Sequence, residues 1–449
     1  MRRTTPLPLL TFASRVARCI GTTTSTDQNS PPSTARYATP ALFFRIHFFN
    51  TFAAASLAED GRDMKSVVAA AATLLLLSLV LDKPGGAVLA QNTGFGRATD
   101  ISPSPADDDR SILLQWRATN PWLQDFWSDL NAPLASWKGV TADKKNGRVV
   151  EIEIHSPQRL IVERLTGTVP AALGNLTALT ALDLSGNWLN GTVPATLGNL
   201  SELTSFNLSG NALEGSVPAT LGKLAALTEL DISRNMLNGT LPATLGQLRA
   251  LTSLRLDRNE LNGTAPAAFE TLLLLEKLDL SSNELRSLPA SLGKLLSLRE
   301  LYLDRNNLEK LPEEIGKLKT LTNLSVAYNK LSELPASIGE LSALVSLELD
   351  LNDLQSLPPN IGKLPTLRVL DLSSNNLSSL PAELGELSTL ESLFLGLNRL
   401  ETLPRELGKL TSLTELDVKQ NQLSSLPDDM FVGLPALTKL SLSYNQLTG

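Results

Sequence analysis

Twelve asparagines recur at a nearly constant interval along the last two thirds of this 449-residue chain. Each closes an apolar-x-apolar-x-x-asparagine pattern in which leucine dominates, and successive asparagines are 24 residues apart four times, 23 apart six times and finally 24 apart. A period this regular indicates a stack of similar units that stabilise one another. The asparagines are Asn187, Asn211, Asn235, Asn259, Asn283, Asn306, Asn329, Asn352, Asn375, Asn398, Asn421 and Asn445.

One repeat already predicts its own local structure. Leu182 and Leu184 alternate with polar residues, which indicates a strand with one buried face. So short a strand pairs with its counterpart in the next repeat, which predicts a parallel sheet. The amide of Asn187 both donates and accepts, so we expect it to bond backbone groups of the neighbouring coil. Pro194 is expected to start the return path and Gly198 to permit its tight bend.

The repeats resemble the leucine-rich-repeat family over about residues 149–449. Through 163–283 the return segment reads L-x-G-x-x-P, as in 189–194, and is similar to plant receptor-kinase ectodomains and polygalacturonase-inhibiting proteins. Through 284–449 it reads L-x-x-L-P, as in 308–312, and is similar to mostly intracellular Ras-suppressor and Scribble-like repeats. The resemblance implies an α/β solenoid: a curved, right-handed stack with a parallel concave sheet and short helical or 3-10 segments on the convex side.

The front of the chain contains a secretory signal that begins unusually late. Lys65 precedes an apolar run at 67–81, and small residues lead up to Ala90, which predicts a signal peptide at 64–90 cleaved near Ala90. Residues 1–63 then form a disordered or non-native leader, with Met64 as the true start. An uncleaved signal anchor at 67–81, an organellar transit peptide and a cytoplasmic protein remain alternative interpretations.

Charge and cysteine content limit the partners of the mature chain. Residues 1–90 hold nine basic and five acidic residues, so their removal leaves 30 basic and 41 acidic residues and a net charge of −11. That balance argues against nucleic acid and against anionic membrane surfaces. Membrane attachment is then expected only through an uncleaved anchor. Cys19 is the only cysteine, so the mature chain has no disulfide, unlike plant-type caps. The oligomeric state is left open.

An N-terminal cap is expected before the repeats. Residues 91–107 read as a linker, and 108–162 as a cap with a helix that starts at three aspartates and ends at Asn120. Trp116, Trp122, Trp127 and Trp137 fall close together. They predict a buried lid over the first coil in preference to a carbohydrate platform. We expect no clear C-terminal cap, since the sequence stops within a return segment and reads as truncated.

Catalysis is not expected. The mature chain has one histidine, His155, and no cysteine, which removes the usual zinc sites and nucleophile triads. Phosphate-binding loops are missing, and the acid pairs Glu313-Glu314 and Asp428-Asp429 fall on return segments rather than across a cleft. We therefore predict no enzyme activity, no cofactor and no metal.

Glycosylation signals bear on the compartment, although the repeat consensus itself generates most of them. Three of them, Asn190, Asn238 and Asn262, are expected in an exit turn on one flank, and Asn207 and Asn323 on the concave face. The N-x-[ST] candidates are Asn175, Asn190, Asn199, Asn207, Asn238, Asn262, Asn323 and Asn376.

The concave face is the predicted binding surface, through strand positions outside the leucine consensus. An Arg/Tyr patch and a group of apolar residues flanked by acids are typical of binding sites. The competing interpretation is that Asp257, Asp304 and Asp350 merely pair with the arginines. The predicted partner-binding residues are Arg234, Arg255, Arg258, Tyr302, Arg305, Tyr328, Glu348, Asp350, Leu351, Phe394 and Leu397.

These observations predict a non-enzymatic recognition protein that binds a protein or glycan ligand, secreted and acting in signalling or defence. One alternative is an intracellular scaffold of the Ras-suppressor type. The other is a truncated ectodomain of a receptor kinase.

Overall fold

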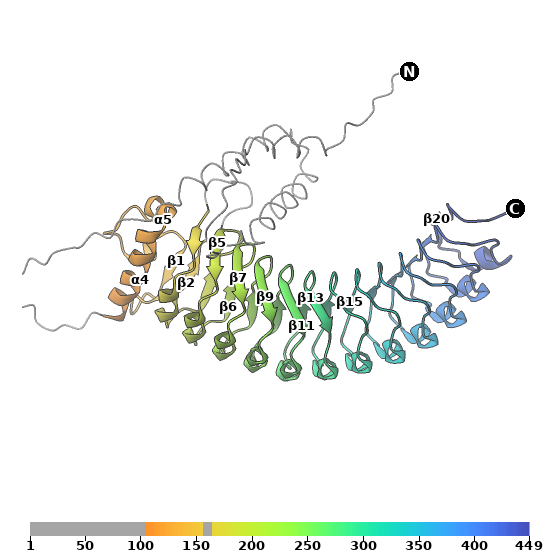
Figure 1. The fold of residues 1–449 in the computed structure, drawn as a ribbon, viewed down its shortest axis with the longest axis horizontal. Helices are drawn as coiled ribbons and strands as arrows, with labels where there is room; N and C mark the ends of the chain where they lie inside the picture. The colour runs from red at the N-terminus through yellow and green to blue at the C-terminus, as the bar shows by residue number, and fades with distance from the viewer. Residues whose placement is uncertain (1–103, 156–163, 449) are drawn as a thin grey trace, which may run out of the picture. The chain divides into compact units, whose positions relative to one another are not determined.

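The computed structural model describes residues 104–155 and 164–448. The leader, the signal peptide, most of the linker and the insertion before the first repeat therefore lie outside the described residues. Everything described belongs to one compact unit, Ala98–Gly449. Figure 1 shows this unit as an arc of stacked coils, with strands along the inner side and one-turn helices along the outer side.

A single 14-stranded sheet lines the concave side. It opens with an antiparallel pair from the cap, and every later strand pairs in parallel with its neighbour in the preceding repeat. The repeat strands are three residues long, and the middle residue is buried in the core, as Leu182 is, except in β20, where Leu440 is exposed. In order, the strands are β1 (Val140–Ala142), β2 (Val149–Glu153), β4 (Ala181–Asp183), β6 (Ser205–Asn207), β8 (Glu229–Asp231), β10 (Ser253–Arg255), β12 (Lys277–Asp279), β14 (Glu300–Tyr302), β15 (Asn323–Ser325), β16 (Ser346–Glu348), β17 (Val369–Asp371), β18 (Ser392–Phe394), β19 (Glu415–Asp417) and β20 (Lys439–Ser441).

A second sheet lies beside the first along the early repeats, and the sequence did not predict it. Its six strands are parallel and follow the turn after each concave strand. It ends with β13, at the start of the 23-residue repeats. Its strands are β3 (Thr166–Thr168), β5 (Trp188–Thr192), β7 (Ala212–Ser216), β9 (Met236–Thr240), β11 (Glu260–Thr264) and β13 (Glu284–Ser287).

The convex side consists of 3-10 helices that, except for η13, each directly follow a proline, whose fixed φ suits the entry to the turn. They are η2 (Ala171–Asn175), η3 (Ala195–Asn199), η4 (Ala219–Lys223), η5 (Ala243–Gln247), η6 (Ala267–Thr271), η7 (Ala290–Lys294), η8 (Glu313–Lys317), η9 (Ala336–Glu340), η10 (Pro359–Lys363), η11 (Ala382–Glu386), η12 (Arg405–Lys409) and η13 (Met430–Gly433), with η1 (Leu134–Ser136) in the cap.

The glycine of the convex turn acts differently from what we expected. Gly198 is not among the residues of positive φ, so it does not serve a special bend. A Cβ added to it would lie 2.3 Å from the carbonyl oxygen of Thr220 in the next repeat. The glycine is required because adjacent coils approach each other too closely for any side chain.

The asparagine ladder is confirmed. The Oδ1 of Asn235 accepts the Leu213 amide at 3.0 Å, and its Nδ2 donates to the carbonyls of Leu208, Ile232 and Ser233 at 3.0–3.2 Å. The side chain is buried, at 5% exposure. Each amide thus supplies partners for backbone groups of its own coil and of the preceding one, where neither helix nor sheet does.

The cap packs against the first coil through helices α4 (Pro105–Thr119) and α5 (Pro121–Phe126). Helix α4 begins before the expected linker boundary at 107, because Ser104 and Asp107 form a reciprocal capping box. Asp109 is 1% exposed, and its Oδ2 accepts from Arg148 Nε at 2.8 Å and the Val149 amide at 2.9 Å. A buried charge-assisted pair therefore ties helix α4 to the start of β2 within the cap.

The tryptophans form the predicted lid. Trp116, Trp127 and Trp137 are 2–4% exposed. The first two meet edge to face with centroids 5.9 Å apart, and Trp137 lies 5.0 Å from Trp127. Half-buried Trp122 stacks on Phe126. Burial of this kind belongs to a core and leaves no aromatic platform for a sugar.

Candidate partner-binding surface

The concave surface is built from columns of side chains that run across the strands. Equivalent residues of successive repeats are directly paired: Tyr302 with Ser325, Ser325 with Glu348, then Glu348 with Asp371 and Asp371 with Phe394. Parallel strands lie about 4.8 Å apart. A column therefore presents one side chain about every 4.8 Å along the stack, and the residue types in it decide what it can bind.

A second column stands at the turn before each ladder asparagine, in a conformation that we did not expect. Ten residues there have a left-handed backbone with φ of 53–60° although none is glycine. That conformation costs an L-residue about 1–2 kcal/mol. The repeat demands it, because the amide donates to the next coil, as Arg234 N does to Asp257 O at 2.7 Å. Gly186 and Gly210 at the equivalent positions of the first two repeats were the available signal.

This turn column carries six of the predicted binding residues and exposes them all. Arg234, Arg258 and Arg305 are exposed, and the apolar members are 38–43% exposed. The left-handed backbone directs these side chains away from the core. The six residues are Arg234, Arg258, Arg305, Tyr328, Leu351 and Leu397.

The charges of the 24-residue half are partly matched. Arg255 reaches Asp231 at 3.4 Å and Asp257 at 3.9 Å, so the pairing interpretation applies to this arginine. Asp257 is 5% exposed, and its burial and the nearby carboxylate of Asp279 raise its pKa. Arg234 and Arg258 form no ion pair within the described part of the chain.

The pairing interpretation is wrong for the acids farther along. Asp304 accepts hydrogen bonds from the Ser325 hydroxyl and from the Ala327 amide, the latter at 2.9 Å. For Asp350, burial and the negative charge of Asp371 raise the pKa of the carboxyl group to about 6. Across residues 104–155 and 164–448, no lysine or arginine nitrogen lies within 4.0 Å of the Asp304 or Asp350 carboxylate.

Tyr302 and Tyr328 each have a cationic side chain over the ring. The guanidinium of Arg305 lies 4.0 Å from the centre of the Tyr328 ring, and Lys277 Nζ lies 5.1 Å from that of Tyr302. Burial and the charge of Glu300 raise the pKa of Tyr302 to about 12. Arg305 is thus engaged with its neighbour's ring, and Tyr302 stays a neutral hydrogen-bonding group at physiological pH.

The expected exit-turn position of three sequons is wrong. Asn190, Asn238 and Asn262 lie within β5, β9 and β11 of the second sheet. On the concave sheet, Asn207 is half-buried and donates to Asp183 at 3.3 Å, and Asn323 is half-buried at the start of β15.

The other three sequons lie elsewhere on the coils. Asn175 and Asn199 are exposed at the ends of convex helices, and half-buried Asn376 donates to Asp353 at 3.4 Å.

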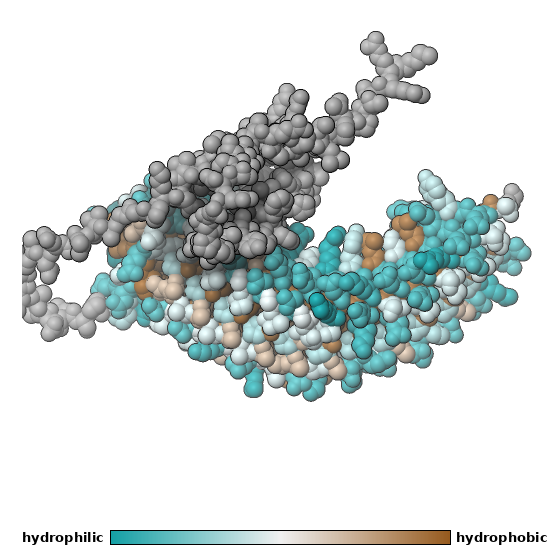
Figure 2. All heavy atoms as spheres, viewed as in Figure 1, coloured by the Kyte–Doolittle hydropathy of each residue, from teal (hydrophilic) through white to brown (hydrophobic). Residues whose placement is uncertain are grey.

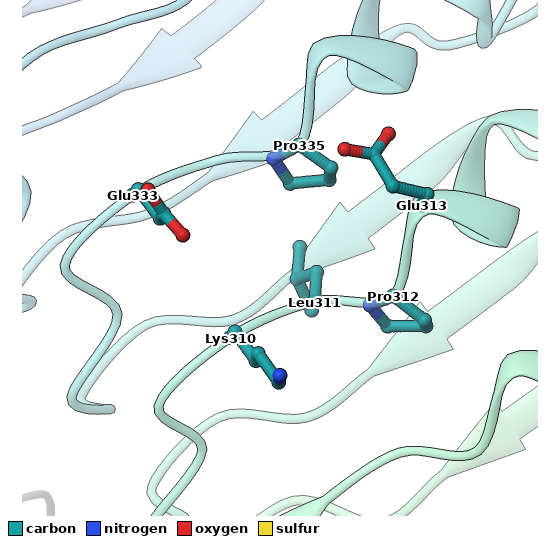
Figure 3. Close-up of a pocket in the computed structure, with 6 residues that line it drawn as sticks. All are labelled: Lys310, Leu311, Pro312, Glu313, Glu333 and Pro335. Carbon is teal, nitrogen blue, oxygen red and sulfur yellow. The ribbon is translucent and has the colours of Figure 1, made fainter.

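Two hollows in the surface of the described residues lie away from the concave face. The one in Figure 3, of about 210 Å³, is lined by equivalent residues of two successive return segments, with Pro312 and Pro335 at the same place in each. Glu313 at the start of η8 belongs to it, so this acid lies on the convex path, as expected. In the described part of the chain, no cluster of histidine, cysteine or acidic residues is arranged to hold a metal, and no helix is long and apolar enough to cross a membrane.

The leucine rich repeat family matches residues 177–237, 249–308, 342–400, 365–423 and 388–447, and a leucine-rich repeat region matches 283–353. These stretches cover more than half of the chain. The chain belongs to the leucine-rich-repeat family. Its solenoid, with a long parallel sheet and short 3-10 helices, is the fold of that family.

Plant receptors are among the relatives of this leucine-rich-repeat protein. It is 31% identical over 106 residues to a probable receptor-like serine/threonine-protein kinase of Arabidopsis thaliana, a match that covers 22% of this chain and 9% of the kinase. The catalytic activity in that name concerns a different domain.

Two solved receptor structures share the repeats. The ectodomain of the Arabidopsis receptor kinase HAESA, in complex with an extended IDA peptide hormone, is 33% identical with a TM-score of 0.62 over 76% of this chain and 58% of the receptor. PEPR1 with AtPEP1 is 31% identical with a TM-score of 0.63 over 76% of this chain and 52% of the receptor chain. This chain therefore spans little more than half the length of these receptor chains.

Proposed function

We propose that this protein is a non-enzymatic recognition module that binds a protein or peptide ligand on its concave face. The observation that carries the proposal is the turn column, where arginine, tyrosine and leucine side chains stand exposed on a rigid, strained backbone. Arg and Tyr are enriched among the residues that dominate binding energy. Pre-organised backbone reduces the entropy lost on binding. The similar receptors HAESA and PEPR1 were solved with peptides, which favours a peptide over a glycan.

We further propose that the module acts outside the cell, after removal of residues 1–90. Two observations support this: the 24-residue repeats at its N-terminal half, and the likeness to plant receptor ectodomains. Exposed sequons on the second sheet, at Asn190 and Asn238, leave room for glycans away from the concave face.

Ligand binding is tested by site-specific photo-cross-linking. A photoreactive residue replaces Arg258 or Tyr328 on the concave face, with Lys310 on the flank as the matched control, and the full chain is incubated with extracellular fluid of the source organism. We expect discrete cross-linked products at the two concave positions only. Equal labelling at Lys310 would show that the concave face is not the binding surface.

The compartment is tested by peptide mass spectrometry of the native protein. We expect an N-terminus at Gln91 and a glycan on Asn190 or Asn238. Peptides from residues 1–63 together with unmodified sequons would favour the intracellular scaffold instead, a reading that the 23-residue repeats support.

A further inference from the structure

Four side chains over β15 to β18 form an apolar strip, defined here as Tyr328, Leu351, Phe394 and Leu397. Tyr328, Leu351 and Leu397 are 43%, 38% and 40% exposed, and Phe394 is half-buried. In Figure 2, hydrophobic groups stand among hydrophilic ones on the upper, concave side of the C-terminal half. Apolar groups gathered on an otherwise polar face mark a surface that binds something.

The strip is bordered by an acidic rim, defined here as Asp304, Glu348, Asp350 and Asp371. No lysine or arginine of the described chain lies within 4.0 Å of these carboxylates. The nearest turn-column cation, Arg305, covers the Tyr328 ring instead. The rim therefore has a surplus of negative charge that forms no ion pair with the residues that the structure describes.

The carboxylates of the acidic rim also share a hydrogen-bond donor. The Ser325 hydroxyl lies within bonding distance of both Asp304 Oδ1 and Glu348 Oε2, the latter at 3.1 Å. A hydroxyl has one proton, so it serves only one of two ionised carboxylates at a time. A ligand that brings several N–H donors and a positive charge would satisfy the remaining oxygens.

We propose that the apolar strip and acidic rim together bind an extended segment of a partner protein in which a lysine or arginine lies close to apolar side chains. This rests on the proposed function and names the chemistry of its ligand. Asp371 pairs in register with Phe394 on the next strand, so charge and apolar surface are about 4.8 Å apart. An extended chain advances about 3.3 Å per residue, so the basic residue falls within three positions of its apolar neighbours.

The test is a selection of random twelve-residue peptides against the immobilised full chain. Enriched peptides should carry lysine or arginine within three residues of a leucine, isoleucine, phenylalanine or tryptophan. Their affinity should fall at least tenfold in the rim variant Glu348→Gln/Asp350→Asn/Asp371→Asn and in the strip variant Leu351→Ser/Leu397→Ser. Higher salt should weaken binding, because the rim carboxylates are exposed or only half-buried. Asp428→Asn/Asp429→Asn, two exposed acids on a return segment, is the matched control and should bind normally. Arg234→Ala/Arg258→Ala, on the same face but four repeats or more from Leu351, probes the other end of the concave surface.

The outcomes separate this inference from the proposed function. Acidic peptides that lose affinity in the Arg234→Ala/Arg258→Ala variant would overturn the ligand chemistry and leave concave-face recognition standing. Peptides that bind every concave variant equally would overturn both, and so would a failure to enrich any peptide. Circular dichroism of each variant excludes unfolding, and the nearly isosteric rim substitutions supply a result even if the strip variant misfolds.

Discussion

The 24-residue and 23-residue halves share one concave sheet but differ on the flank beside it. In the first half the return segments pair as strands, for example Asn190 with Ala212 and Thr192 with Glu214. In the second half the same path makes only one or two backbone bonds per repeat, such as Lys330 N to Leu308 O at 2.9 Å. The early coils therefore have a second sheet on this flank, whereas the coils after β13 have only isolated backbone bonds there.

A flank glycine accompanies the second sheet in the 24-residue repeats. Gly191 and Gly215 have φ of 72° and 80°, and a Cβ on either would come within 3.1 Å of the γ-methyl of a threonine in the preceding repeat. Between Asn283 and Asn421 the repeats have neither this glycine nor the extra residue, although β13 at the start of this stretch still pairs with β11. The concave sheet, the asparagine ladder and the convex glycine are common to both halves, and these shared features determine the stack itself.

The largest effects should be equal in the two halves. Asn235→Ala and Asn329→Ala each remove an amide that bonds four backbone groups. Since unpaired buried groups cost about 1–3 kcal/mol each, we expect either variant to lower the free energy of unfolding by about 3 kcal/mol or more. Urea denaturation measures this. A variant within 0.5 kcal/mol of the wild type, a margin typical of neutral surface changes, would contradict the ladder's role.

The two glycine types should differ from each other. Gly222→Ala places a Cβ 2.2 Å from the Thr244 carbonyl oxygen, so the coils must separate, at a cost of about 3 kcal/mol. Gly339→Ala, 1.9 Å from the Asn360 carbonyl oxygen in the other half, should cost as much. Gly239→Ala meets nothing nearer than 3.9 Å and should lose only about 1 kcal/mol, through its φ of 76°. Thermal unfolding measures the loss of stability in each of the three variants. Equal losses at all three sites would refute the distinction between the convex glycines and the flank glycine.

Hydrogen exchange should distinguish the coils that have the second sheet from those that lack it. Amides of β7 are in a ladder, whereas those of Ser332 and Glu333 donate no backbone hydrogen bond within the described residues and are exposed. We expect exchange in 212–216 to be at least tenfold slower than in 332–334, since exchange requires the bond to open. Mass spectrometry of peptides from both stretches compares them. Comparable rates would mean that the second sheet adds no protection.

The smallest effect concerns pH and belongs to the 23-residue half. The pKa of Asp350 is raised to about 6, so between about pH 4 and 6 the folded state holds a proton that the unfolded state has lost. Stability contributed by this group therefore falls as pH rises through that window. Asp350→Asn should gain about 1 kcal/mol on the wild type from pH 4 to pH 7, after discount for solvent screening. Asp353→Asn, at an exposed position, is the control and should not reproduce the gain.

Much of the fold was predictable from period alone. A fixed spacing between ladder asparagines determines the register of the concave sheet, and from it the columns that hold Asp371 and Phe394. The second sheet could not be predicted in this way, since Trp188 to Thr192 contains a glycine and reads as a turn. Its strands form only because a neighbouring coil lies close enough to bond. Stacking of the coils brings that neighbour into place, whereas the strand propensity of the segment itself does not.

The candidate binding surface was likewise only partly predictable from the sequence. Its members were predictable as non-consensus positions, but their interactions were not, because each depends on a side chain one or more repeats away. Arg305 turns to the ring of Tyr328, Asp304 accepts from Ser325, and Arg255 reaches back to Asp231.

The sequence by itself determined a stack of coils, the buried leucines and the outward columns, because these follow from a repeat in which every unit must bury the same face. The tertiary structure alone decided where the second sheet stops, which charges are paired, and that ten side chains leave the turn from a left-handed backbone. Those features arise from the separation and orientation of adjacent coils, about 4.8 Å apart, and a linear chain does not encode such distances one residue at a time.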